Sequence, residues 1–128
     1  MTLRLLDSNV IMDLLNGVPE IDHVVRQLFE SGDTVCTCDV VIAEVLSGVH
    51  PPHRPVTQMF LERCRFLPST PTIGERAGTW RSGYLRQGIT LSIPDLLIAA
   101  TAVEYDATLL TRNARHFPMP ELSTLLLN

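Results

Sequence analysis

Short apolar runs alternate with longer amphipathic stretches along nearly the whole chain, and this alternation restricts the fold more than any other feature. Residues 3–6, 34–38 and 107–111 are apolar or β-branched runs of the kind found in buried parallel strands. The stretches between them carry apolar side chains at helical spacing. The pattern predicts a three-layer α/β domain, with a central, mostly parallel sheet flanked by helices and right-handed crossovers.

Glycine and proline mark where the amphipathic stretches begin and end. A proline-rich segment, 49–55, is expected to be a loop rather than a domain boundary, because neither half could close a core alone. Residues 1–128 are therefore expected to form a single domain. Helices are expected over about 10–15, 19–31, 40–47 (with Asp39 as N-cap), 56–65, 73–87 and 94–105. Two further strands are expected at 66–69 and, at a sheet edge, 122–127.

Composition excludes several classes of protein. With 45% apolar and 19% charged residues, the chain fits a compact globule. No apolar run approaches the roughly 18 residues of a membrane span, and the first residues lack a signal-peptide pattern, so a cytoplasmic location without membrane contact is expected. Cys36, Cys38 and Cys64 show neither disulfide nor zinc-site spacing and are expected to pack as small apolar side chains.

Polar side chains recur where predicted strands hand over to helices. Asp7, Glu44, Asp95 and Asn113 occupy such positions at widely separated points of the chain. Because the carboxyl ends of parallel strands share one edge of the sheet, these side chains are expected to converge there. Carboxylates that converge repel one another unless a cation binds between them. The arrangement indicates metal-dependent chemistry.

Each acidic residue also has a purely structural interpretation. Asp7 and Asp95 each stand at a predicted helix start, where a carboxylate caps the helix or favours its N-terminal dipole. Glu44 lies in a nearly apolar helix, so it either faces solvent or points at a metal or partner, since an unpaired buried acid is costly. Asp13 and most other acids are expected to be ordinary solvated surface, whereas Asp39 and Asp106 border strands and could act as caps or turn residues. Joint placement on one edge favours a single site over three coincidences.

Four segments, in order, resemble the motifs of PIN-domain ribonucleases, especially VapC-type toxins of toxin–antitoxin pairs. The segments are LLDSNVIMDLL at 5–15, VIAEVLSG at 41–48, IPDLLIAATA at 93–102 and TRNARHF at 111–117. The resemblance implies a PIN-like fold and a Mg²⁺- or Mn²⁺-dependent endoribonuclease that hydrolyses RNA. It also implies inhibition by a cognate antitoxin, whose C-terminal segment enters the active-site groove, and a homodimer within the toxin–antitoxin complex.

Carried onto this chain, the resemblance makes Asp7, Glu44 and Asp95 the catalytic metal ligands. Asn113 matches a catalytic position that is often aspartate; its amide oxygen still suits a hard cation but brings no charge. Thr111 is expected to orient a water or a phosphate oxygen. Arg112 and Arg115, and to a lesser extent His116, are expected to hold flanking phosphates of the RNA substrate.

Two other classes of function compete with this interpretation. Receiver domains and related phosphotransferases also place an aspartate after the first strand, but they depend on a lysine, and all ten basic residues here are arginine. A degenerate PIN domain that binds RNA or protein without cutting is the stronger alternative, supported by Asn113. The net charge of −4 argues weakly against nonspecific nucleic-acid binding, although a bound cation would reverse the local sign.

Overall fold

The computed structural model describes residues 2–127 and contains one five-stranded sheet in the order β3-β2-β1-β4-β5. The strands are β1 (Leu3–Leu6), β2 (Thr34–Thr37), β3 (Arg65–Phe66), β4 (Thr108–Thr111) and β5 (Thr124–Leu126). Every neighbouring pair is parallel; in the centre, Leu5 lies opposite Cys36 on one side and Leu109 on the other. The expected parallel α/β architecture is confirmed.

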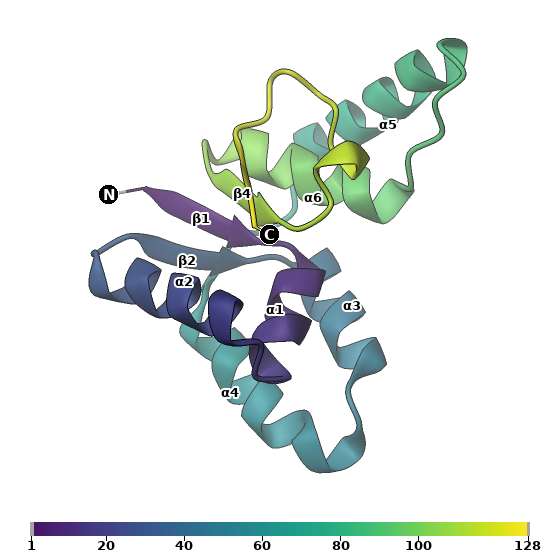
Figure 1. Cartoon of the computed structure of the whole chain (residues 1–128). Coiled ribbons are helices and arrows are strands. Elements are labelled where there is room, and N and C mark those ends of the chain that lie inside the picture. The colour runs from purple at the N-terminus through teal and green to yellow at the C-terminus, as the bar shows by residue number, and fades with distance from the viewer. Residues whose placement is uncertain (1, 128) are drawn as a thin grey trace.

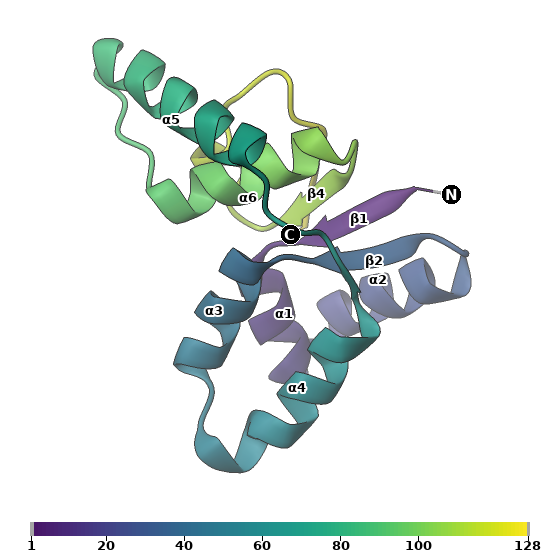
Figure 2. The same ribbon diagram turned by 180° about the vertical axis from the view of Figure 1, so that it is seen from behind.

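Helices cover both faces of this sheet, so the molecule has three layers (Figure 1). The α-helices are α1 (Ser8–Leu15), α2 (Pro19–Glu30), α3 (Asp39–Gly48), α4 (Arg54–Arg63), α5 (Pro71–Arg86) and α6 (Ile93–Glu104). Two short 3₁₀ helices are η1 (Pro51–His53) and η2 (Ala114–His116). Figures 1 and 2 show α1 to α4 on one side of the sheet and the packed pair of α5 and α6 on the other.

The core lies where the central strands meet α1 and α6. Leu5, Leu109 and Leu110 are fully buried, as is most of α6 from Leu96 to Ala102. Since α6 is packed between the sheet and α5, its sequence is almost continuously apolar rather than amphipathic. The three cysteines are also buried and free, as expected of small apolar side chains.

Several element boundaries differ from the expected ones, and three of these differences are informative. The proline-rich segment is not a plain loop, because η1 and the first turn of α4 lie within it. Prolines fit there since the first helical positions need no N–H donor. The third strand is Arg65–Phe66, earlier and shorter than expected. Asp39 is the first residue of α3 rather than its N-cap, which is Cys38.

The described chain begins at the amino ends of the parallel strands and ends at their carboxyl ends (Figure 1). The first strand enters at the amino edge, whereas the backbone N–H of Leu127 donates to the carbonyl of Thr111 at 2.8 Å, at the carboxyl edge. In residues 2–127, no helix has both the length and the apolar character needed to cross a membrane.

Candidate active site

The carboxyl edge of the sheet gathers the acidic residues singled out by the sequence. Asp7 follows β1, Glu44 lies in α3, and Asp95 lies in the first turn of α6. In both ribbon views the beginnings of α1, α3 and α6 meet at this edge (Figures 1 and 2). The charge of Asp95 acts on both Asp7 and Glu44, and the charge of Asp7 acts on Glu44. The three carboxylates therefore face a common region.

Asp7 is held rigidly in a buried position. Its side chain is 4% exposed and caps α1 by accepting the backbone N–H of Ser8 at Oδ1, at 2.8 Å. Its other oxygen, Oδ2, accepts the hydroxyl of Thr111 at 2.8 Å, across 104 positions of sequence. Burial raises the pKa of Asp7 above its ordinary value of 3.8, and the nearby charge of Asp95 acts in the same direction, while the two hydrogen bonds oppose the rise. The capping interpretation of Asp7 is confirmed, and its role as a metal ligand stays a prediction.

Glu44 projects from α3 toward the same region and does not lie in an open polar stripe. It is partly buried, and among the described residues its buried Oε1 atom has no hydrogen-bond partner. Burial raises its pKa, the Ser8 side chain opposes this through a hydrogen bond, and the charges of Asp95 and Asp7 raise it further. A buried carboxylate oxygen without a hydrogen-bond donor is destabilising unless a cation or a proton compensates it.

Asp95 is positioned by the start of α6. Its backbone N–H donates to the hydroxyl of Ser92, the N-cap, at 3.2 Å, which fixes the first turn of the helix. Its Oδ2 atom lies 3.4 Å from Nδ1 of His116 in η2. His116 is half exposed, so this contact sits at the solvent side of the site.

Thr111 and Asn113 form the end of β4 at this edge. The hydroxyl of Thr111 donates to Asp7 and accepts the backbone N–H of Asn113 at 3.0 Å, so it ties the turn after β4 to the buried carboxylate. Thr111 itself is fully buried. Its expected contact with water or phosphate stays a prediction. Asn113 is partly exposed and directly precedes η2.

The arginines expected to contact phosphate differ in how they are held. Nη1 of Arg112 lies 2.6 Å from Oδ2 of Asp13, an ion pair between the end of β4 and α1. Asp13 was expected to be ordinary solvated surface and is instead part of this half-buried pair. Arg115 is exposed in η2, beside His116. Phosphate binding by either arginine stays a prediction.

The donor set fits a hard divalent cation. Magnesium prefers carboxylate oxygens and keeps several waters, so it needs only one or two protein carboxylates rather than a closed cage. Asp7, Glu44 and Asp95 offer such oxygens, and the buried Oε1 of Glu44 has no hydrogen-bond partner within residues 2–127 that would compete with a cation. Within residues 2–127, no three His, Cys, Asp or Glu side chains are close enough to form a complete coordination group. Waters and substrate oxygens would therefore complete the coordination.

Comparison with known proteins agrees with this geometry. A sequence model of the PIN domain matches residues 4–121. The chain belongs to the PIN domain family. Among curated relatives, ribonuclease VapC19 of Mycobacterium tuberculosis is 31% identical over 121 residues, which is 94% of this chain and 97% of the relative. Ribonuclease VapC10 of the same organism is 33% identical over 117 residues, covering 91% and 87%.

Solved structures share the PIN fold over its full length. VapBC-1 from nontypeable Haemophilus influenzae has a TM-score of 0.83 at 25% identity and covers 98% of each chain. VapBC2 from Rickettsia felis, bound to a promoter DNA fragment, has a TM-score of 0.84 at 22% identity, covering 99% of this chain and 100% of that chain. The resemblance to VapC-type PIN ribonucleases expected from the four motifs is confirmed.

Two residues of this PIN site were missed or given little weight by sequence reasoning. Ser8 is buried beside Asp7 and interacts with Glu44, although it reads as part of an ordinary helix start. His116 contacts Asp95 directly, whereas its position suggested a contact with flanking phosphate. Neither contact has a local sequence signal, because both join elements far apart in the chain.

Proposed function

We propose that this protein is an endoribonuclease toxin that hydrolyses RNA phosphodiester bonds with a divalent cation, Mg²⁺ or Mn²⁺, at the carboxyl edge of its sheet. The observation that carries the proposal is the unpaired, buried Oε1 of Glu44 facing the charges of Asp7 and Asp95. Such a group destabilises the metal-free protein, and a bound cation would compensate its charge. The similarity to the VapC ribonucleases supports the same reaction.

The chain's own residues divide the work of holding the cation and the RNA. Both oxygens of Asp7 are oriented by hydrogen bonds, yet each keeps a lone pair for a further partner. Glu44 offers its Oε1 atom, which has no hydrogen-bond partner among the described residues. Asp95 offers a carboxylate whose contact with His116 lies at the solvent side of the site, where solvent can replace it. When bound, the cation supplies positive charge for the phosphate and acidifies a water molecule.

RNA is expected to run past η2, where His116 contacts Asp95, Asn113 is partly exposed and Arg115 is exposed. The amide of Asn113 can orient a water or a phosphate oxygen without adding charge. Arg115 can neutralise a flanking phosphate. Arg112 keeps further N–H donors beyond the one used with Asp13, so it also remains available at the rim of the site.

A cognate antitoxin is the proposed inhibitor. The solved relatives from Haemophilus influenzae and Rickettsia felis are VapBC assemblies, and a structure from Klebsiella pneumoniae with a TM-score of 0.76 is a toxin–antitoxin complex. We infer the same kind of partner for this chain, together with a homodimer and a cytoplasmic site of action, where the RNA substrate is available.

Cleavage of total RNA by purified, partner-free protein tests the proposal. With Mg²⁺ or Mn²⁺ we expect discrete fragments, and with EDTA or in Asp95→Asn protein we expect none. Glu104→Gln is the matched control, because Glu104 is exposed at the far end of the same helix. If Asp7→Asn protein is folded and still cuts, the site is wrongly assigned. If no RNA is cut although metal binds, the non-catalytic binding module is the better description.

A further inference from the structure

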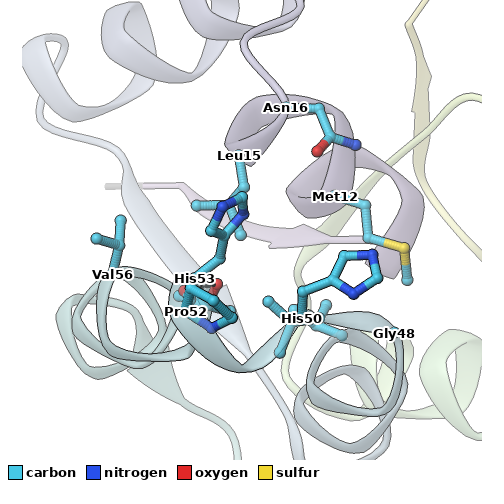
Figure 3. Close-up of a pocket in the computed structure, with 11 residues that line it drawn as sticks. Met12, Leu15, Asn16, Gly48, His50, Pro52, His53 and Val56 are labelled. Carbon is cyan, nitrogen blue, oxygen red and sulfur yellow. Dashed lines mark hydrogen bonds between the residues drawn. The ribbon is translucent and has the colours of Figure 1, made fainter.

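A cavity of about 270 Å³ opens between α1, α3 and the segment formed by η1 and the start of α4 (Figure 3). Met12, Leu15 and Asn16 line it from α1, and Val45 and Gly48 line it from α3. His50 and His53 stand on the opposite wall, and Figure 3 shows both imidazole rings directed toward α1. None of the proposed metal ligands or phosphate-binding residues lines this cavity.

The cavity lies about one helical turn beyond the carboxylates, along both α1 and α3. Gly48 follows Glu44 by one turn of α3, which is roughly 6 Å along the helix. On the facing helix, Met12 follows Ser8 by one turn, and Ser8 interacts with Glu44. An RNA strand with a phosphate at the carboxylates therefore brings an adjacent nucleotide to the mouth of the cavity.

The lining favours a flat, neutral group. No Asp, Glu, Lys or Arg lines the cavity, so it offers neither a fixed partner for phosphate nor one for a cationic side chain. It does offer two imidazole rings, the amide of Asn16 and the apolar surface of Met12 and Leu15. Unstacked bases of single-stranded RNA are recognised by this combination of aromatic stacking and hydrogen bonds to base edges. The volume lies just below the usual range for drug-sized ligands, as suits one base.

We propose that this cavity, the His50–His53 pocket, binds one unstacked base of the RNA substrate next to the bond that is cut. The inference rests on the proposed ribonuclease function and adds a residue-level source of its sequence preference. The imidazoles stack on the base or form hydrogen bonds with its edge, and the amide of Asn16 forms a hydrogen bond at a second position of that edge.

Binding measurements with a series of short RNAs test the pocket separately from catalysis. The protein is full-length Asp95→Asn, which is not expected to cut, and each RNA carries a single abasic site at a different position. In this background we expect one abasic position to weaken binding about tenfold, the size of a lost base–aromatic stack. Adding His50→Ala and His53→Ala should weaken binding of intact RNA by a similar factor and remove the effect of that abasic position.

Two further variants separate stacking from the general loss of a histidine side chain. His53→Phe keeps a flat ring and should recover part of the affinity lost in His53→Ala. His23→Ala is the matched control, since His23 is exposed on α2 and lines none of the cavities described here. Both pocket histidines are exposed, so the folded state should tolerate their replacement, which a thermal unfolding curve checks.

The outcomes distinguish this inference from the proposed function. If the abasic effect persists after both histidines are replaced, the base lies elsewhere; the inference is wrong and the nuclease proposal stands. If the histidine variants bind RNA normally but lose affinity for the antitoxin, the pocket serves a protein and the inference is again wrong. If the protein with Asp95 intact neither binds nor cuts RNA, the proposed function fails and the inference fails with it.

Discussion

Glu44 is a carboxylate in α3, a helix whose other inward side chains are apolar. Its Oε1 atom has no hydrogen-bond partner within the described residues. Its raised pKa means that the folded state holds a proton more tightly than the unfolded chain, whose ordinary value is 4.5. The free energy of unfolding therefore falls as the pH rises from about that value through the higher pKa of the folded state. Asp7 contributes in the same direction from its ordinary value of 3.8.

Replacing Glu44 by glutamine should stabilise the metal-free protein at neutral pH while abolishing RNA cleavage. Glutamine removes the desolvated charge and its repulsion with Asp7 and Asp95. We expect a gain of roughly 0.5–2 kcal/mol, the usual size for a single stabilising change. Denaturant unfolding at several pH values measures it, and the gain should shrink toward pH 4, roughly where the unfolded Glu44 becomes protonated. Equal destabilisation at every pH would contradict the assignment.

The hydroxyl of Thr111 should be more important to the site than its methyl group. Thr111→Val keeps the shape but leaves the buried Oδ2 of Asp7 without its donor, so we expect a loss of roughly 1–3 kcal/mol in stability. The pKa of Asp7 should rise further, moving the pH profile of cleavage upward. Thr111→Ser keeps the donor and serves as the control; a valine variant with an unchanged pH profile would argue against this role.

At the level of single residues, sequence reasoning found the carboxylates but not their contacts. Asp7 could be recognised from its position after a strand, where an aspartate can be either a helix cap or a ligand. The structure shows that it caps α1 at the carboxyl edge of the sheet. The ion pair of Arg112 with Asp13 joins positions 99 apart, so nothing local distinguishes Asp13 from ordinary surface. Contacts of this kind depend on strand order, which periodicity does not contain.

At the level of elements, the N-terminus of α6 fixes the position of Asp95. Ser92→Ala removes the cap that accepts the N–H of Asp95, so we expect a loss of about 1 kcal/mol in stability and a marked drop in cleavage. Thr70→Ala removes the equivalent cap of α5, where the Thr70 hydroxyl accepts the N–H of Ile73. It should cost similar stability with little effect on activity. Equal activity losses in the two variants would show that only stability matters.

Helix and strand existence followed from the sequence, whereas some boundaries did not. The segment with three prolines among residues 51–55 reads as a loop, yet Pro51, Pro52 and Pro55 occupy first-turn positions where a missing N–H is harmless. Strand β3 is only two residues long, because it pairs at the sheet edge with β2 alone. Such short edge pairing depends on the neighbouring strand rather than on local propensity.

At the level of the whole molecule, the proposed metal ion would join three separate elements. It would contact Asp7 at the start of α1 and Asp95 in α6, and it would bind Glu44 in α3 either directly or through a water molecule. Binding to the folded state alone should raise the stability by about 2.7 kcal/mol at a cation concentration 100 times the Kd. Thermal unfolding against Mg²⁺ or Mn²⁺ concentration measures this, and EDTA should reverse it. Glu44→Gln should flatten the dependence, while Glu104→Gln should not.

The architecture was predictable because each apolar run is short and lies between helical stretches, which leaves few alternatives to a parallel sheet. The order of the strands was not, since β1 in the centre and β5 beside β4 follow from packing across the whole chain. That order is what brings Thr111 against Asp7 and creates the site.

The hydrogen bond from Leu127 to Thr111 has a practical consequence for anyone handling the protein. An affinity tag, fluorescent label or fusion partner placed after β5 would begin at this carboxyl edge, where the catalytic site is proposed to lie. A tag placed before β1 leaves from the far edge of the sheet instead (Figure 1). Amino-terminal tagging is therefore the sound choice for activity measurements, and a carboxyl-terminal fusion offers a deliberate way to obstruct the enzyme.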